Sequence, residues 1–171
     1  GVVQKHMINI LNVTPSAMSL FGKARVSTLE VLLAGGERLS KDTSTAWSKS
    51  VRAFFNDYGP TEAAVDSTGT RCISGAAFAD SIGVPLLNFA ANIVDVSYNG
   101  TLVSAPGQLV VNGPQVARGY FKAPAQTRKV FARPRMCTDT GSTIFAQSRS
   151  YQTGDLSRYL PDGTIAFMGR I

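Results

Sequence analysis

The sequence contains few of the side chains that build metal centres and thiol chemistry. Its 171 residues include one histidine, His6, and two cysteines, Cys72 and Cys137, which lie far apart along the chain. A tetrahedral zinc site needs several histidine or cysteine ligands, and a cysteine nucleophile needs a nearby base, so neither kind of site is expected. We interpret both cysteines as reduced, buried thiols of a cytoplasmic protein.

Long apolar runs and the glycine motifs of common nucleotide sites are also missing. No apolar run approaches the roughly 20 residues that a membrane-spanning helix needs, and no secretory signal peptide is evident. Neither GxxxxGKS, GxxxxGKT nor GxGxxG occurs, which excludes P-loop and Rossmann sites. Because the chain starts with Gly1 and stops at Ile171, directly after a Met-Gly-Arg run, we expect it to be part of a longer protein.

Acidic residues are scarce, with 11 Asp and Glu against 17 Lys and Arg, so the net charge is +6. The basic residues are scattered, however, and the densest run, residues 126–135, holds only four of them. A nucleic-acid-binding surface clusters its positive charge, so a non-catalytic basic module that binds nucleotides or nucleic acid is kept only as an alternative. The hydrophobic fraction of 44% is ordinary for a globular core of one medium domain or two small ones.

The first half of the chain alternates apolar runs with patterns that start helices. Three compact apolar runs predict buried strands, at residues 7–11, 29–34 and 51–55. Thr14 followed by Pro15, and Ser40 before residues 41–50, predict capped helices between those strands. This alternation indicates a parallel βαβ layer over residues 1–83, in which ligands bind at the carboxyl ends of the strands.

The second half, residues 84–171, changes to short alternating apolar runs separated by turns. Asn99-Gly100 and Asp162-Gly163 are hairpin signals, and one helix is expected near residues 123–131. Residues 132–150 are polar and rich in Gly, Ser and Thr, which predicts a mobile loop. The predicted fold class is therefore α/β, followed by a small, mostly-β barrel or distorted sheet.

Two short segments hold side chains that suit a phosphorylated ligand. Tyr58, Thr61 and Glu62 flank a Gly-Pro turn, where a tyrosine can stack on a base and a glutamate can bind a hard cation. Asp155 follows Thr153-Gly154 and can accept hydrogen bonds from a ribose diol. Taken singly, each of these residues also has an ordinary interpretation as a surface, turn or packed side chain. Their combination and their order along the chain carry more information.

Four motifs occur in order along the chain: LLAGGERLS, FFNDYGPTEAAV, GQLVVNGPQVARGY and YQTGDLSRYLPDGTIAFMGR. This order strongly resembles the adenylation domains of non-ribosomal peptide synthetases, in the adenylate-forming superfamily of acyl-CoA synthetases and luciferases. Gln108 and Gln152 depart from the pattern, which has Glu and Arg at those places. The second motif is most similar to fungal synthetases of the siderophore type. By this resemblance the chain is the central-to-C-terminal portion of the large core subdomain of that fold.

The resemblance implies a site for ATP. Tyr58 would stack on adenine with Asn56 at its amino edge, and Asp155 would bind the ribose hydroxyls. Thr61 and Glu62 would be the catalytic residues, with Thr61 beside the α-phosphate and Glu62 as the ligand of Mg²⁺. The other residues that the resemblance assigns to ATP binding are Gly35, Gly36, Glu37, Phe167 and Arg170.

The resemblance also implies a pocket for the acid that is activated. Its lining would be Asn12, Leu32, Ala34, Asp57, Val65 and Asp66. Because buried carboxylates need partners, two aspartates and an amide predict a polar acyl substrate, such as an ornithine derivative. The alternative is that Asp57 or Asp66 faces away from the pocket.

The implied activity is ATP-dependent ligation. An amino acid or other carboxylic acid and ATP form an acyl-adenylate and pyrophosphate, and the acyl group then moves to the phosphopantetheine thiol of a carrier domain. Carrier and condensation domains of the same synthetase are the expected partners, and an acyl-CoA or aryl-acid ligase is the alternative. The superfamily's phosphate loop and amine-binding aspartate would precede Gly1 and its catalytic lysine would follow Ile171, so these residues alone are expected to be inactive.

Overall fold

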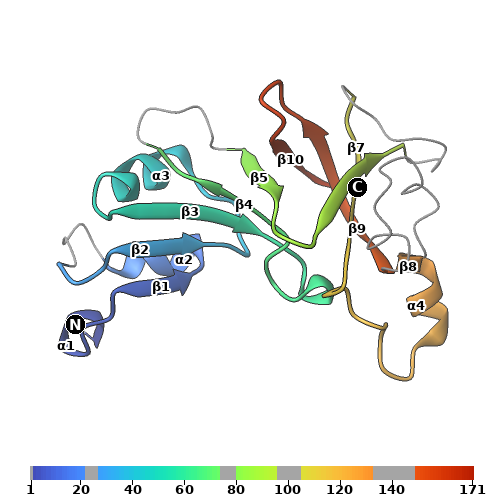
Figure 1. Cartoon of the computed structure of the whole chain (residues 1–171), viewed down its shortest axis with the longest axis horizontal. Helices are drawn as coiled ribbons and strands as arrows, with labels where there is room; N and C mark the ends of the chain where they lie inside the picture. Colours follow the sequence, from blue (N-terminus) through green and yellow to red (C-terminus); the bar gives the residue numbers. More distant parts are fainter. Residues whose placement is uncertain (1, 22–26, 74–79, 96–104, 133–148) are drawn as a thin grey trace.

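The computed structural model describes residues 2–21, 27–73, 80–95, 105–132 and 149–171 (Figure 1). Within these residues the strands form one mixed sheet with the order β1-β2-β3-β4-β5-β10-β9-β7-β6, and β8 pairs with β9 outside this path. The predicted turn at Asn99-Gly100, most of the predicted loop 132–150 and Cys137 lie outside the described residues.

The first part of the sheet contains three parallel strands. β1, β2 and β3 pair in parallel, and β4 pairs antiparallel with β3. Their bounds are Ile10–Val13 (β1), Val31–Ala34 (β2), Ala53–Tyr58 (β3) and Thr68–Arg71 (β4). The sequence predicts a strand that ends at residue 55, and this end is wrong: β3 continues through Tyr58 because β4 supplies backbone partners for residues 56–58.

Short helices precede and connect the parallel strands. They are α1 (Val2–Lys5), α2 (Pro15–Met18), the 3-10 turn η1 (Ser19–Phe21) and α3 (Lys41–Ser48). Both predicted N-caps are confirmed, because the Thr14 hydroxyl accepts from the Ala17 N–H at 3.3 Å and the Ser40 hydroxyl accepts from the Thr43 N–H at 3.1 Å. Among the helices of the described segments, none is long and apolar enough to cross a lipid bilayer.

The second part of the sheet is antiparallel. Its elements are η2 (Thr61–Ala63), β5 (Ser81–Pro85), β6 (Ala90–Val94), β7 (Gly107–Gly113), α4 (Pro124–Val130), β8 (Phe131–Ala132), β9 (Arg149–Tyr159) and β10 (Ile165–Arg170). The predicted hairpin at Asp162-Gly163 joins β9 to β10, where Gly163 has a φ of 82° and the Leu160 N–H donates to the Thr164 carbonyl at 2.7 Å. In the described part of the chain the strand order ends at β6 without closing, so the distorted sheet is present and not the barrel.

Two hydrophobic clusters support the two parts of the sheet. Met18, Leu32 and Phe54 belong to the first, and a second cluster is centred on Leu109 and Ile165. Strands β5 and β10 connect the two parts in the middle of the molecule (Figure 1). The division into subdomains near residue 83 stays a prediction.

Candidate functional site

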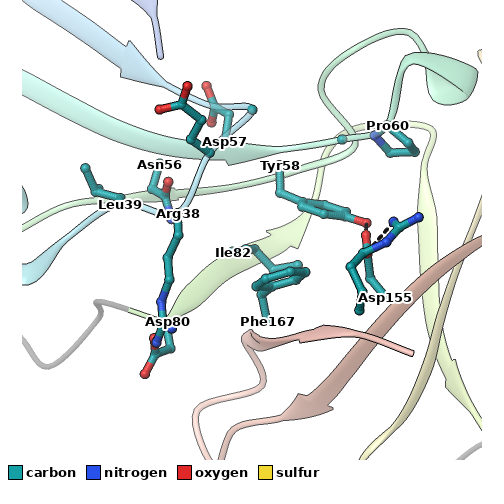
Figure 2. A pocket seen from close by; sticks show the side chains of 14 residues that line it. Arg38, Leu39, Asn56, Asp57, Tyr58, Pro60, Asp80, Ile82, Asp155 and Phe167 are labelled. Atoms are coloured by element: carbon teal, nitrogen blue, oxygen red, sulfur yellow. Dashed lines mark hydrogen bonds and ion pairs between the residues drawn. The ribbon is translucent and has the colours of Figure 1, made fainter. Parts of the chain in front are cut away.

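A pocket of about 290 Å³ opens beside the carboxyl end of β3, against β5, β9 and β10 (Figure 2). Its lining residues are Gly36, Glu37, Arg38, Leu39, Asn56, Asp57, Tyr58, Gly59, Pro60, Asp80, Ile82, Asp155, Phe167 and Arg170. Most residues with a predicted role in nucleotide binding are thus brought together from β3, β9 and β10, although the sequence separates them by about a hundred positions. Gly35, Thr61 and Glu62 are not part of this lining.

Strand β3 directs Asn56 and Tyr58 to the pocket side of the sheet. Successive side chains of a strand point to opposite faces, so Asp57, between them, points to the other face, as Figure 2 shows. The Asn56 side-chain nitrogen donates to the Ser81 carbonyl at 2.8 Å, and this contact fixes the amide in a buried position. The amide oxygen of Asn56 is therefore the atom available to accept a hydrogen bond from a ligand.

Asp155 is a buried carboxylate at the centre of a hydrogen-bonded cluster. Only 5% of the residue is exposed. The Tyr58 hydroxyl donates to Asp155 Oδ2, and Arg170 Nη1 donates to Asp155 Oδ1 at 2.6 Å and to the Thr153 carbonyl at 3.0 Å. Burial, followed by the hydrogen bond to Asp155, raises the pKa of the Tyr58 hydroxyl, so Tyr58 stays a protonated donor. The contacts hold the carboxylate at the pocket edge with defined orientation.

The rings of Tyr58 and Phe167 are the two aromatic surfaces in the lining of the pocket. Their centroids lie 6.3 Å apart with an angle of 36° between the ring planes. Phe167 reaches this position from β10 at an irregularity in the β9–β10 register between Phe167 and Gly169. Two aromatic faces beside an amide oxygen and a buried carboxylate suit a flat heterocycle that carries a polyol.

Glu62 lies outside this pocket, on η2. Its Oε1 accepts a hydrogen bond from the Tyr120 hydroxyl at 2.6 Å, and its backbone carbonyl accepts from the Ala117 N–H at 2.8 Å. Burial opposes ionisation of the Glu62 carboxyl, but the hydrogen bond from Tyr120 and smaller contributions outweigh it and lower the pKa. Glu62 is therefore an ionised carboxylate, which is the form that binds a cation. Thr61, next to it, is exposed.

Glu37 has a structural partner. Its carboxylate accepts from the Ser16 N–H at 2.9 Å and from the Ser16 hydroxyl at 2.8 Å, and these bonds lower its pKa. The contact ties the loop after β2 to the start of α2. Glu37 thus lines the pocket with its carboxylate already hydrogen-bonded to Ser16. Its neighbour Gly36 has a φ of 80°, a left-handed conformation that glycine adopts without strain.

Residues 1–121 match the family of AMP-binding enzymes. The chain belongs to this family. The matched range includes β3 and η2, and therefore Asn56, Tyr58 and Glu62. Asp155, Phe167 and Arg170 follow the matched range but fall within the longer similarities to individual relatives.

Those relatives of this AMP-binding enzyme are very long proteins. The chain is 37% identical to a linear gramicidin synthase polypeptide of Brevibacillus parabrevis over 172 residues, which is 100% of the chain and 2% of the relative. It is 35% identical to nonribosomal peptide synthetase 7 of Aspergillus fumigatus over 170 residues, 99% of the chain and 7% of the relative. It is also 35% identical to the ferrichrome siderophore peptide synthetase of Mycosarcoma maydis over 181 residues, 100% of the chain and 4% of the relative.

The structure does not bring all six predicted acyl-pocket residues of this AMP-binding enzyme together. Leu32 and Ala34 are 1% and 0% exposed and lie in the hydrophobic cluster with Phe54, on the opposite face of the sheet from Asp57. The register aligns Asn12 with Leu33, so Asn12 shares the face of Asp57. The role of Leu32 and Ala34 in lining an acyl pocket stays a prediction, and a shift of one residue along a strand would place the neighbouring side chains on the face of Asp57 instead.

Leu33 and Gly35 are the residues that sequence reasoning did not assign to this face. Leu33 is half-buried beside Asn12, and a Cβ placed on Gly35 would lie 3.0 Å from the Asp57 carbonyl oxygen. Strand alternation counted outward from Asp57 and Asn12 is the signal that could have identified them. The continuous apolar run Leu-Glu-Val-Leu-Leu-Ala concealed it, since both faces of β2 are apolar.

Asp57 is a buried carboxylate without a favourable partner. It is 9% exposed, and among the described residues no side chain or backbone group donates a hydrogen bond to it. Burial raises its pKa to about 6, and the charge of Asp66 adds to the effect. Burial also raises the pKa of Asp66. Val65, between the turn and Asp66, is 61% exposed and has a φ of 76°, a conformation that strains a β-branched residue.

The turn between Tyr58 and η2 leaves no room for a side chain at Gly59. A Cβ there would lie 2.0 Å from the Val65 carbonyl oxygen and 2.7 Å from the Ser67 nitrogen. We therefore expect Gly59→Ala to destabilise the intact domain by about 3 kcal/mol in chemical denaturation. Gly163→Ala is the control, because its Cβ meets nothing within 4 Å and only its φ of 82° makes alanine unfavourable, by about 1 kcal/mol. Equal losses in the two variants would contradict the steric argument.

Proposed function

We propose that this chain is the part of an adenylation domain that binds ATP and the acid to be activated. The observation that carries the proposal is the cluster of Asp155, Tyr58 and Arg170 beside Phe167 in a pocket of about 290 Å³. A carboxylate oxygen of the acid attacks the α-phosphorus of ATP, the bond to the β-phosphate breaks, and pyrophosphate leaves. The products are an acyl-adenylate and pyrophosphate.

Each pocket residue has a role in holding the adenosine part of ATP. The adenine ring lies against Tyr58 and Phe167, and the Asn56 amide oxygen accepts from its amino group, because the amide nitrogen is engaged by Ser81. The ribose hydroxyls donate to Asp155, whose orientation is fixed before the nucleotide arrives. This pre-organisation directs the triphosphate toward the turn that ends in Thr61 and Glu62.

The family implies Mg²⁺, and Glu62 fits a magnesium ligand. Mg²⁺ in nucleotide sites typically takes one or two protein carboxylates and completes its shell with phosphate oxygens and water. The described residues contain no group of three or more His, Cys, Asp or Glu that could form an all-protein site, so an ionised Glu62 is the suitable contribution. When bound, Mg²⁺ would neutralise charge on the phosphates.

The acceptor of the acyl group is proposed to be the phosphopantetheine thiol of a carrier domain in the same synthetase. This proposal is supported by the similarity to three peptide synthetases over nearly the whole chain. An acyl-CoA or aryl-acid ligase of the same superfamily would instead use free coenzyme A or an aryl acid. Transfer of labelled acyl group to a carrier domain, compared with transfer to coenzyme A, distinguishes them.

The acid is proposed to carry a positive charge or several hydrogen-bond donors on its side chain. The support is Asp57, a buried carboxylate that has no donor among the described residues, with Asp66 as a second carboxylate that raises its pKa. A cationic group would be stabilised by both charges, whereas an apolar side chain would leave Asp57 unpaired.

ATP–pyrophosphate exchange with an intact domain carrying this chain tests the activity and the acid together. We expect exchange with ornithine, lysine or their derivatives to exceed exchange with leucine or phenylalanine by at least about tenfold, because an unpaired buried carboxylate costs more than about 1.4 kcal/mol. Preference for leucine or phenylalanine would refute the acid assignment alone. Absence of exchange with any acid would refute the proposed activity.

A further inference from the structure

The segment between β7 and α4 makes two hydrogen bonds to Glu62, one to its carboxylate and one to its backbone carbonyl. The Tyr120 hydroxyl donates to Glu62 Oε1 at 2.6 Å, and the Ala117 N–H donates to the Glu62 carbonyl at 2.8 Å. Residues 117–120 thus bind both the backbone and the carboxylate of Glu62, from a position 58 residues away for the Tyr120 contact. The Tyr151 hydroxyl lies 3.4 Å from that of Tyr120 and extends the chain of polar groups to β9.

The position of the Tyr120 hydroxyl is itself fixed. The Tyr120 N–H donates to the Thr127 hydroxyl at 2.9 Å, and this hydroxyl donates to the Ala123 carbonyl at 2.9 Å. The Tyr120 ring meets Phe131 edge to face, with centroids 5.4 Å apart. Gly119 has a φ of 143°, and a Cβ on it would lie 2.3 Å from Thr127 Cγ2, so the segment fits closely against α4. These contacts to Thr127 and Phe131 therefore restrict the position of the Tyr120 hydroxyl.

A glutamate side chain has three rotatable bonds, so an ionised carboxylate at the surface samples many orientations. One charge-assisted hydrogen bond from a rigid donor removes most of that freedom. We propose that Tyr120 is a positioning residue that orients the Glu62 carboxylate toward the magnesium ion accompanying ATP. The inference rests on the proposed function, because it takes Glu62 as a cation ligand. In this role Tyr120 acts only through Glu62 and contacts neither ATP nor the acid.

The hydroxyl of Tyr120 can be removed with little change to the fold by Tyr120→Phe, which keeps the ring against Phe131. Tyr159→Phe is the matched control, since the Tyr159 hydroxyl donates to the Ala91 carbonyl at 3.0 Å in the second hydrophobic cluster and not to Glu62. The measurement is Mn²⁺ binding to the intact domain in the presence of a non-hydrolysable ATP analogue, followed by electron paramagnetic resonance. The Mg²⁺ dependence of pyrophosphate exchange is measured in parallel.

We expect Tyr120→Phe to raise the dissociation constant for Mn²⁺ and the half-saturating Mg²⁺ concentration by about tenfold, as loss of an outer partner of a metal ligand does. Saturating Mg²⁺ should restore most of the exchange rate. Tyr159→Phe should change neither quantity. Equal Mn²⁺ affinity for Tyr120→Phe and the unmodified domain would overturn the proposal.

Two further variants separate the possible failures. Glu62→Gln should weaken Mn²⁺ binding more than Tyr120→Phe does; unchanged binding in Glu62→Gln would remove the metal role of Glu62, and with it this inference. Loss in Glu62→Gln without loss in Tyr120→Phe would overturn the role of Tyr120 alone. Should Tyr120→Phe fail to fold, Thr127→Val tests the same support by releasing the Tyr120 N–H, and it should also raise the Mn²⁺ dissociation constant.

Discussion

Replacing Asp155 by alanine is expected to weaken ATP binding by about 100-fold or more. Each hydrogen bond from a ribose hydroxyl to a carboxylate contributes about 1.5–3 kcal/mol, so the loss of two corresponds to at least about 3 kcal/mol. The variant also leaves the Tyr58 hydroxyl without its acceptor, which loosens the ring that we propose to face the adenine. The Arg170 side chain is 72% exposed, so water solvates its charge when Asp155 is removed.

Calorimetric titration of the intact domain with ATP measures this effect. Asp162→Ala is the matched control, because Asp162 is a carboxylate on the same hairpin that accepts hydrogen bonds from Thr164 and does not line the pocket. Its affinity for ATP should equal that of the unmodified domain. An Asp155→Ala domain that binds ATP within about threefold of the unmodified domain would show that Asp155 is not the ribose ligand.

Replacing Asp57 by asparagine is expected to stabilise the domain at neutral pH and to impair selection of the acid. The pKa of Asp57 in the fold is about 6, above the ordinary value of 3.8, so the folded state binds the proton more tightly than the unfolded state. Its contribution to stability is therefore fully present below pH 3.8 and is lost as the pH rises through about 6. At pH 7 and above, the ionised carboxylate destabilises the fold by on the order of 2–3 kcal/mol.

Asparagine removes that destabilisation, since it has no charge to bury. The free energy of unfolding of Asp57→Asn, measured by chemical denaturation, should exceed that of the unmodified domain by about 2 kcal/mol at about pH 7.5 and by much less at about pH 4. Asp66→Asn should reproduce a smaller part of the gain, because Asp66 contributes to the raised pKa of Asp57. A gain that does not depend on pH would contradict the electrostatic account.

Asp57→Asn should at the same time reduce the preference for a cationic acid over leucine in pyrophosphate exchange. A substrate cation bound beside Asp57 would favour the ionised carboxylate and lower its pKa, so the destabilisation present without substrate is relieved on binding. Residues that destabilise a fold while serving a ligand are common at functional sites. A variant that is more stable and equally selective would separate Asp57 from substrate recognition.

Local patterns in the sequence predicted several elements of the fold because their physical causes are local. Thr14 and Ser40 cap α2 and α3 with their own side chains, and the Asp162-Gly163 turn needs only a glycine with positive φ. The length of β3 depends on a partner strand, β4, whose Thr-Gly-Thr-Arg sequence has no pronounced apolar pattern. Pairing between strands therefore extended β3 beyond residue 55, where the apolar run ends.

In the candidate site, too, some features follow from local sequence and others depend on contacts between distant segments. The motif around Tyr58 and the motif around Asp155 indicated a nucleotide, and the structure brings Tyr58 and Asp155 into a direct hydrogen bond. The contact between Tyr120 and Glu62 could not be derived from the sequence, since it depends on how the segment before α4 returns to η2. The sequence also does not reveal which face of the sheet Leu32 and Ala34 occupy, but for another reason. In a strand buried on both sides, hydrophobicity does not reveal the register.

We propose above that the pocket beside β3 holds the adenosine part of ATP. A crystal structure of the intact domain with bound AMP tests it most directly. We expect the adenine ring to lie against Tyr58 and Phe167 and the ribose hydroxyls to donate to Asp155. AMP bound elsewhere, with the Tyr58–Asp155–Arg170 contacts unchanged and the pocket free of nucleotide, would contradict it.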